Sequence, residues 1–420
     1  MMAALIFGTF AFLLIIGLPI ALAIGLASFI ILVTQDVPLV VIAQRMFAGT
    51  DSFPLVAVPF FILAGDLLAK GKISDRLVNF AESFLGFLRG GLWVVSVVAA
   101  MFFAGITGSG AADTAAIAAP LIPELKKRNY RQNFSAALIA SAGVIGVVIP
   151  PSVPMVLYCC IADQSIGRLF LNGFIPGTLM GLALIGVALQ EAYKNHYPRG
   201  AGVSLRNIWK TFKTAILGLL TPLIILGGIF SGYFTPSEAA AVAFNWAIFV
   251  SLFVYREIGW REFFQTIVKS AITSAIVMFI IATANVFGWI LANWQVPNTI
   301  ASAVLSISQN KYIILLLIDL IILIAGCVME TASALIILTP IFLPLVNQLG
   351  VSLIHFGIIM VVGLAIGMVT PPVAICLYVS STISGLSIEE ISRALVRPLT
   401  GLIAAWLFLT YFPLFVNIIF

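Results

Sequence analysis

The chain has 420 residues, of which 62% are hydrophobic and only 9% are charged. Soluble domains carry roughly 25% charged residues, so this composition excludes an ordinary soluble protein. It predicts an all-α polytopic membrane protein whose surroundings are the lipid bilayer. The formal net charge of +5 is then no indication of nucleic-acid binding, and we expect no nucleic-acid partner.

Apolar runs long enough for the ~20 residues of a membrane-spanning helix follow one another along the chain. The first run lacks a basic n-region and is too long for the core of a signal peptide, so we interpret it as a retained span. Gly17 and Pro19 predict a kink within it. The predicted membrane segments lie near 4–33, 54–69, 132–162, 169–192, 215–232, 238–254, 270–292, 354–381 and 399–419.

Two further apolar stretches, 90–127 and 312–347, each contain two short helical runs separated by a polar or glycine-rich break. Each half is too short to cross a bilayer, so both stretches are predicted to be re-entrant hairpins with protein or water around their tips. An apolar segment with two adjacent prolines follows each hairpin, "GVVIPPS" at 146–152 and "GMVTPPV" at 367–373. Because proline removes a backbone donor and clashes with the preceding turn, 132–162 and 354–381 are predicted to be broken helices.

These features recur at an offset of 221 residues. Gly105 matches Gly326, Pro123 matches Pro344, and the two proline pairs match each other. We predict a first repeat over 1–192, a linking loop and span over 193–235, and a second repeat over 236–420. Because the link adds one crossing, the second repeat is expected to be inverted, which is the architecture of secondary transporters.

The basic residues predict the orientation in the membrane. All but three of the 21 Lys and Arg residues lie in the loops at 70–89, 126–131, 194–213, 256–269 and 393–397, and the exceptions are Arg45, Arg168 and Lys311. Basic loops face the cytoplasm. This rule places the N-terminus in the cytoplasm and the C-terminus on the periplasmic side.

The breaks and the hairpin tips bring polar groups to membrane depth. Carbonyl groups freed at 146–149 and 367–370 lack helical partners, and hard cations such as sodium favour oxygen ligands of this kind. "TGSGAAD" at 107–113 and "GCVMETAS" at 326–333 form the tips. A carboxylate within the membrane, such as Glu330, indicates a functional site. Plain proline kinks and helix N-caps remain alternative interpretations of the same residues.

Several motifs resemble one known family. "GSGAADTAAI", "LIPELKKRNY", "GVVIPPS" and "GYFTPSEAAAVA" are similar, in this order and over nearly the whole chain, to the large membrane (M, DctM-type) subunit of tripartite ATP-independent periplasmic (TRAP) transporters. The resemblance implies an elevator-type, sodium-driven importer of organic acids in a bacterial inner membrane, using at least two sodium ions. It also implies two partners, a small four-helix membrane subunit and a periplasmic substrate-binding protein.

The resemblance further implies functional residues. The first sodium site would use Gly108, Ser109, Gly146, Ile149 and Pro151, and the second would use Gly326, Thr331, Gly367 and Thr370. The organic-acid substrate would lie between the tips, near Ser109, Asp113, Ser152, Glu330 and Thr331. No arginine at membrane depth is available to hold a carboxylate, so hydroxyl and half-helix N–H groups are expected to do so. Sialic acid is preferred over a C4-dicarboxylate or another sugar acid, from overall resemblance alone.

Three other functions compete with this interpretation. A self-sufficient sodium–carboxylate symporter of similar fold would need no partner proteins. An integral membrane enzyme would need clustered His, Cys or acidic residues at one membrane face, and the adjacent pair Cys159–Cys160 has no such companions in the sequence. A passive channel would not need paired broken helices. We therefore expect a transporter and no enzymatic activity.

Overall fold

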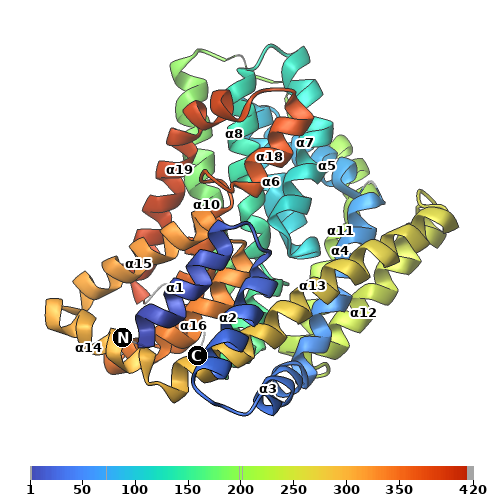
Figure 1. Cartoon of the computed structure of the whole chain (residues 1–420). Helices are drawn as coiled ribbons and strands as arrows, with labels where there is room; N and C mark the ends of the chain where they lie inside the picture. Colours follow the sequence, from blue (N-terminus) through green and yellow to red (C-terminus); the bar gives the residue numbers. More distant parts are fainter. Residues whose placement is uncertain (1, 72, 198, 201, 414–420) are drawn as a thin grey trace.

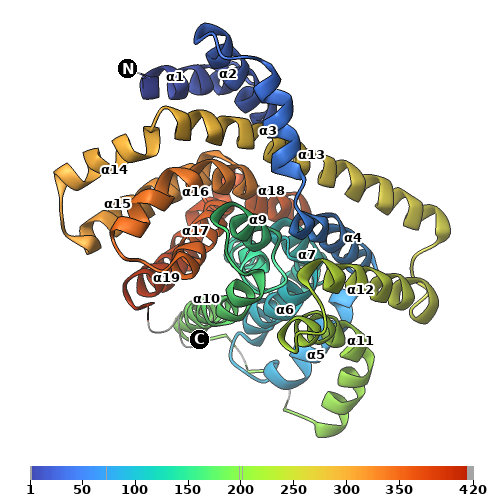
Figure 2. The same cartoon turned by 90° about the horizontal axis from the view of Figure 1, so that it is seen from below.

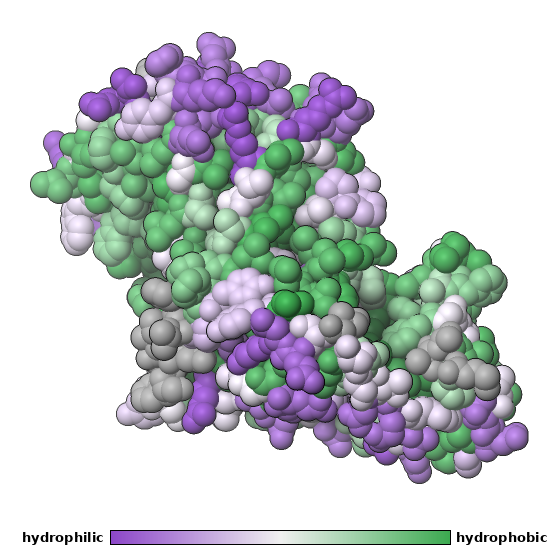
Figure 3. Space-filling model, turned by 90° about the vertical axis from the view of Figure 1, so that its left-hand side faces the viewer, coloured by the Kyte–Doolittle hydropathy of each residue, from purple (hydrophilic) through white to green (hydrophobic). Residues whose placement is uncertain are grey.

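The computed structural model describes residues 2–71, 73–197, 199–200 and 202–413. Within them the chain is helical, and a single isolated β-bridge pairs Arg89 with Arg199. Eight described helices are long and apolar enough to cross a membrane. Figure 3 shows an apolar band between two hydrophilic ends, as expected for a protein that spans a bilayer. The predicted all-α polytopic membrane class is confirmed.

The helices of the first predicted repeat include both of its expected special features. The hairpin over 90–127 is formed by α6 and α7, and the broken helix over 132–162 by α8, η2 and α9. The bounds are α1 (Met2–Ile15), α2 (Ile20–Thr34), α3 (Val40–Thr50), η1 (Phe53–Val56), α4 (Ala57–Lys70), α5 (Ile73–Leu85), α6 (Gly91–Thr107), α7 (Gly110–Lys127), α8 (Gln132–Gly143), η2 (Val144–Val147), α9 (Val153–Ala162) and α10 (Ile166–Lys194).

The remaining helices repeat this order after one linking span. The second hairpin is α15 and α16, and the second broken helix is α17 and α18. Both Pro–Pro peptide bonds in the two breaks are cis. The bounds are α11 (Leu205–Phe230), α12 (Pro236–Ile248), η3 (Phe249–Val254), α13 (Trp260–Asn293), α14 (Val296–Ile307), α15 (Lys311–Val328), α16 (Thr331–Gln348), α17 (Leu353–Gly367), α18 (Ile375–Ser384) and α19 (Ile388–Tyr411).

The prediction of a single kinked span over 4–33 is wrong. The chain turns at Gly17, whose φ is +89°, and two short helices, α1 and α2, pack against each other (Figure 1). The prediction of a cytoplasmic N-terminus assumed that this segment crosses the membrane once. Because it forms two helices, the span count no longer supports that placement, which stays a prediction. Met1 and residues 414–420, which include the end of the predicted span 399–419, lie outside the described residues.

The two hairpins and the two broken helices interlock. The second helix of each hairpin packs against the second part of the other repeat's broken helix, α7 against α18 and α16 against α9. The long helices α10 and α19 pack against each other beside them. Figure 2 shows these helices gathered in one group. We call this group, α6–α10 and α15–α19, the hairpin unit. Because each repeat contributes to the other's packing, the hairpin unit forms one body.

A second group of helices lies along one side of the hairpin unit. The 34-residue α13 is in contact with α2, α3, α4 and α16, and α12 packs on α4. In Figure 2, α13 runs between the α1–α3 segment and the hairpin unit. We call α1–α4 and α11–α13 the scaffold. At about 1.5 Å per residue, α13 is roughly 50 Å long, more than a bilayer core requires, so part of it extends beyond the apolar band.

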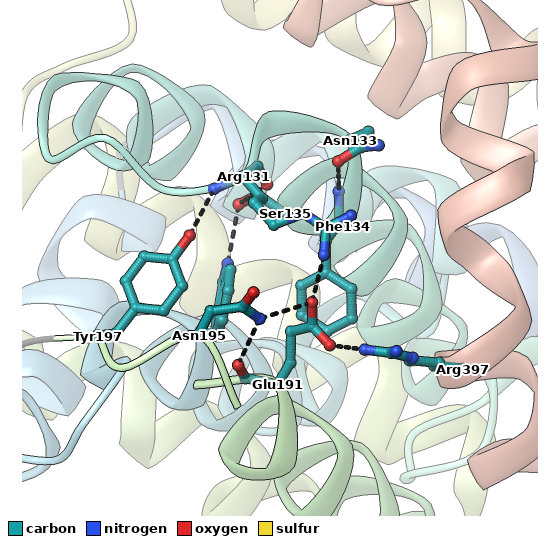
Figure 4. A network of polar contacts seen from close by, with 9 residues as sticks. Arg131, Asn133, Phe134, Ser135, Glu191, Asn195, Tyr197 and Arg397 are labelled. Carbon is teal, nitrogen blue, oxygen red and sulfur yellow. Dashed lines mark hydrogen bonds and ion pairs between the residues drawn. The ribbon is translucent and has the colours of Figure 1, made fainter. Parts of the chain in front are cut away.

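A buried charge ties the hairpin unit together at one end. The Glu191 side chain of α10 is 1% exposed. Its Oε1 accepts a hydrogen bond from Arg131 Nη1 of the α8 N-terminus at 2.5 Å and one from Asn195 Nδ2 at 3.0 Å, and its Oε2 contacts Arg397 of α19 (Figure 4). One carboxylate therefore joins three helices from both predicted repeats.

Removing this charge should destabilise the protein. In Glu191→Gln, two guanidinium groups face each other without their shared anion, and because both arginines are half exposed we expect a loss of about 2 kcal/mol, less than for a fully buried pair. Thermal unfolding in detergent should shift down by several degrees. The matched control is Glu389→Gln, which breaks an exposed i,i+4 pair with Arg393 and should cost below about 0.5 kcal/mol. Equal shifts for both variants would contradict this role.

Candidate substrate and ion site

The first hairpin tip is a tight turn held against the first helix break. Helix α6 ends at Thr107, and Gly108 has a φ of +64°, a conformation that favours glycine. A Cβ at Gly108 would lie 2.6 Å from the carbonyl oxygen of Pro151. Ser109, the N-cap of α7, is extended, and its N–H donates to the Thr107 hydroxyl at 3.2 Å. The tip thus places the start of α7 directly beside the Pro–Pro break.

Asp113 lies behind this tip and lines none of the three cavities described below. Its side chain is completely buried, and one carboxylate oxygen accepts a hydrogen bond from the Thr107 hydroxyl. The other oxygen, Oδ2, has no hydrogen-bond partner among the described residues. A Cβ at Gly146 would lie only 2.1 Å from this Oδ2. Asp113, predicted to bind substrate, therefore lies against Gly146, which was predicted for the first sodium site.

An unpartnered buried carboxylate oxygen is costly unless a cation or a donor satisfies it. Asp113 Oδ2 lies beside η2, whose Gly146 was predicted to bind sodium through its carbonyl group. A carboxylate together with backbone oxygens is a donor set that suits a hard cation. The residues present therefore fit a sodium ion at this break.

The second tip has the same construction with different residues. Helix α15 ends at Val328, and Glu330 is the N-cap of α16, where its carboxylate accepts from Ser333 N–H at 3.2 Å and from the Ser333 hydroxyl at 3.3 Å. The buried Thr331 hydroxyl has no hydrogen-bond partner among the described residues. Glu330 therefore caps α16, and Thr331 offers a free oxygen.

The second break packs backbone against backbone. A Cβ at Gly367 would lie 2.3 Å from the carbonyl carbon of Gly326, so two glycines predicted for the second sodium site are in direct contact. Val373 N–H donates to the Cys327 carbonyl at 3.1 Å, which ties the break to the hairpin. The Thr370 hydroxyl donates to the Ile366 carbonyl at 3.0 Å. The structure therefore brings together the four residues of the second predicted set around one tip and one break.

Ser152 and Ile149 have structural contacts. The Ser152 side chain is buried, donates to the Val147 carbonyl at 2.5 Å and accepts from Met155 N–H at 3.3 Å. It caps α9 and does not line the substrate-sized cavity described next. The side chain of Ile149 packs against Gly177 of α10. The family resemblance implied Ser152 as a substrate residue, but its hydroxyl is used by the backbone.

Both tips face one cavity of about 460 Å³. Of the five predicted substrate residues, Ser109, Glu330 and Thr331 line it, and so does Gly108. The opposite wall is formed by two scaffold helices, α4 and α13. Other lining residues from these helices are Ile62, Gly65, Asp66, Lys269, Thr273 and Val277. We call this space the central cavity.

A second cavity, of about 900 Å³, adjoins the central one. The two share Asp66, Ala112, Ala115 and Lys269 as lining residues. The larger cavity extends toward the ends of α5 and α7, where its wall includes Glu82, Glu124 and Arg128. Glu82 and Arg128 belong to the basic loops 70–89 and 126–131, so the route from the tips leads to the face predicted to be cytoplasmic. We call it the inner cavity.

Lys269 is a functional candidate that the sequence analysis missed. It was assigned to a cytoplasmic loop, but α13 begins at Trp260, so Lys269 lies on the helix and lines both cavities. The expectation that no arginine at membrane depth is available to hold a carboxylate did not consider lysine. Lys269, Thr273 and Val277 are spaced four residues apart, which puts them on one helix face. That spacing was a usable signal, but it could be recognised only once the helix start was known.

Asp66 and Lys70 also gain partners that the sequence did not indicate. Asp66 Oδ2 of α4 accepts from the Ser270 hydroxyl of α13 at 2.6 Å, and Lys70 Nζ donates to the Thr266 hydroxyl at 2.8 Å. Both bonds join α4 to α13 along the inner cavity. Asp66 is therefore a scaffold contact, which leaves Lys269 without an acidic partner among the described residues.

Comparison with known proteins identifies the family. The sequence profile of the DctM component of tripartite ATP-independent periplasmic transporters matches residues 7–415. An isethionate TRAP transporter permease of Oleidesulfovibrio alaskensis is 44% identical over 97% of this chain, and the chain spans 65% of that relative's length. A C4-dicarboxylate TRAP transporter large permease of Pseudomonas aeruginosa is 40% identical over 89% of this chain and 87% of its own length.

A solved structure supports the fold. The YdaH transporter of Alcanivorax borkumensis superposes with a TM-score of 0.55, at 13% identity, over 89% of this chain and 87% of that one. At this identity the likeness concerns the fold alone. The profile match and the relatives decide the family, and these relatives are named as permeases, not as enzymes. This chain belongs to the DctM family of TRAP transporter large membrane subunits and is a transporter.

Proposed function

We propose that this chain is the transport subunit of a sodium-coupled, binding-protein-dependent importer of an organic acid. The observation that carries the proposal is the central cavity. It is lined by the tips of both hairpins on one side and by α4 and α13 on the other. A substrate held there touches the hairpin unit and the scaffold at once, as carriage of substrate past a fixed wall requires.

Sodium coupling is supported by the unpartnered oxygens beside the two breaks. Asp113 Oδ2 lies against Gly146 at the first break. The unpartnered Thr331 hydroxyl belongs to the second tip, at the start of α16, and Gly326 just before that tip packs on Gly367 of the second break. Each set contains a side-chain oxygen without a partner together with backbone of a broken helix. Two such sets suggest at least two sodium ions carried with each substrate, and each ion would hold a hairpin tip to its break.

The substrate class follows from the groups lining the central cavity. The Lys269 ammonium can hold a carboxylate or sulfonate, and Ser109 and Thr331 can bind hydroxyl groups. The two relatives carry names that refer to isethionate and a C4-dicarboxylate, so a small organic anion of this kind is our preferred substrate. Sialic acid, preferred from the sequence, stays a prediction, because no cavity residue selects for it.

We further propose that the two repeats are inverted and that the hairpin unit moves as an elevator. The interlocking of α7 with α18 and of α16 with α9 supports movement as one body. The continuity of the central and inner cavities supports an inward-facing arrangement in this structure. The family name supports the two partners, a small four-helix membrane subunit and a periplasmic binding protein, and an inner-membrane location in bacteria.

Replacing Lys269 should weaken substrate binding selectively. Lys269→Gln removes a charged hydrogen-bond donor at the mouth of the central cavity, worth about 1.4 kcal/mol for such a solvent-accessible bond. The substrate concentration for half-maximal uptake should rise about tenfold, and Lys269→Arg should restore most of it. Lys127→Gln, the same change at the exposed C-terminal end of α7, is the control. If both glutamine variants behave alike, Lys269 does not contact the substrate.

The proposed function is tested by uptake into liposomes that contain the chain with its two partner proteins. Isethionate, a C4-dicarboxylate and sialic acid are offered under a sodium gradient or a potassium gradient. We expect sodium-dependent uptake of one or more acids that rises more than linearly with sodium concentration. Uptake that is equal in potassium would overturn sodium coupling. Saturable uptake by the chain alone would instead support the self-sufficient symporter.

A further inference from the structure

A third cavity, of about 440 Å³, lies at the other end of the scaffold. Its walls come from α3, η1, α9, α13 and α16, and α3 lies at the lower end in Figure 1, away from the α7–α8 loop. Arg45 is the one charged side chain among the described residues that line it. The remaining polar lining includes Ser52 and Asn285. We call it the outer cavity.

The Arg45 guanidinium is held on the scaffold. Its Cζ lies 5.4 Å from the ring centroid of Trp289 on α13, a cation–π contact that orients the charge. Gly49, one turn further along α3, packs so closely on α13 that an added Cβ would lie 2.5 Å from Asn285 Cβ. Helix α3 is therefore in close contact with α13 at Gly49, and the contact with Trp289 places the exposed Arg45 side chain at the cavity wall.

The outer cavity is the repeat counterpart of the central and inner cavities. The offset of 221 residues that relates the two proline pairs also relates five of its lining residues to theirs. Arg45, Ala48, Ser52, Ile336 and Pro340 correspond in this way to Thr266, Lys269, Thr273, Ala115 and Ala119. In both places a scaffold helix faces the second helix of a hairpin, α13 facing α7 on one side and α3 facing α16 on the other.

The outer cavity and its counterpart, the central and inner cavities, each have a basic residue at nearly matching positions. Lys269 corresponds to Ala48, and Arg45 lies three residues before Ala48 on the same helix, about one turn away. Basic residues are sparse on the outer side. Only three Lys or Arg residues of the sequence lie outside the basic loops of the opposite face: Arg45, Arg168 and Lys311. A lone cation in a cavity without an acidic group attracts anions and repels cations.

We propose that the outer cavity is an anion-binding site on the substrate's route from the outer side to the hairpin tips. Arg45 holds the carboxylate or sulfonate group of the anion before it reaches the tips. The inference rests on the proposed function for the identity of the anion as substrate. The site itself depends only on Arg45 and the walls of the outer cavity. Arg45 then does on the outer side what Lys269 does on the inner side.

Cys160 provides a direct test, because it lines the same cavity. In purified protein in detergent, with Cys159, Cys327 and Cys376 replaced by Ala, Cys160 is labelled with an anionic reagent, 2-sulfonatoethyl methanethiosulfonate, or a neutral one, methyl methanethiosulfonate. Arg45→Gln should slow labelling by the anionic reagent about three- to tenfold and change the neutral rate less than about twofold. Arg45→Lys should keep the preference for the anion.

Arg168→Gln is the matched control, because it removes an exposed cation of the outer side that does not line the cavity. It should leave both labelling rates unchanged. An unchanged ratio of anionic to neutral labelling in Arg45→Gln overturns the proposal. Charge-selective labelling without uptake of any organic acid would retain the outer site and reject the proposed function, whereas sodium-driven uptake without charge-selective labelling would do the reverse.

Discussion

Replacing Asp113 by Asn should reduce sodium-driven uptake about 100-fold. The amide can still accept the hydrogen bond from Thr107, but the charge beside Gly146 is lost. Removing one partner of a buried charge pair costs about 3 kcal/mol or more, which corresponds to roughly 100-fold weaker ion binding. The sodium concentration for half-maximal uptake should rise accordingly, so high sodium should restore part of the activity.

A binding measurement separates this effect from misfolding. Sodium that binds only the folded protein raises its melting temperature relative to potassium at equal ionic strength. The wild-type chain should show this stabilisation, and Asp113→Asn should lose most of it while keeping a similar melting temperature in potassium. Asp163→Asn, at an exposed position after α9, is the control and should keep the response. A normal sodium response in Asp113→Asn would assign this carboxylate a purely structural role.

Replacing Gly65 by Val should block transport without unfolding the protein. Gly65 lies on α4 at the wall of the central cavity, and an added Cβ would be 2.9 Å from both the Cα and the carbonyl oxygen of Thr107. Backbone atoms at a hairpin tip cannot move aside as a flexible side chain can. We expect about 3 kcal/mol of overpacking in this arrangement and roughly 100-fold slower uptake.

The elevator predicts a specific pattern for Gly65→Val. If the hairpin unit slides past α4, the clash exists in one arrangement only, and the protein can populate the other with little loss of stability. The melting temperature should then stay within a few degrees of the wild type while uptake falls. The control is Gly227→Val on α11, where an added Cβ meets nothing within 4 Å. A large fall in melting temperature with Gly65→Val would indicate a permanent contact and favour local gating over an elevator.

The sequence by itself determined the membrane class, both helix pairs of the predicted hairpins and both broken helices. These features depend on local properties. The length of an apolar run limits whether a helix can span, and proline lacks an N–H wherever it occurs. The hairpins predicted at 90–127 and 312–347 agree with α6–α7 and α15–α16 to within a residue or two. No long-range contact was needed to recognise them.

The first apolar segment was decided only by tertiary structure. A Gly–Pro break in an apolar run is compatible with a kinked single helix or with two helices that turn back on each other. Composition and length are the same in both cases. The packing of α1 against α2 selects the second, and this contact leaves no mark in the local sequence.

The functional site shows the same division. Sequence motifs indicated Ser109, Glu330 and Thr331 at the tips, where polar residues interrupt apolar helices, and the structure places all three at the central cavity. The direction of a side chain depends on its neighbours, and for this reason Ser152 caps a helix and Asp113 faces Gly146 instead of the cavity. The positions of Lys269 and Arg45 depended on how α13 and α3 pack against helices distant in sequence, because a cavity forms only when such segments meet.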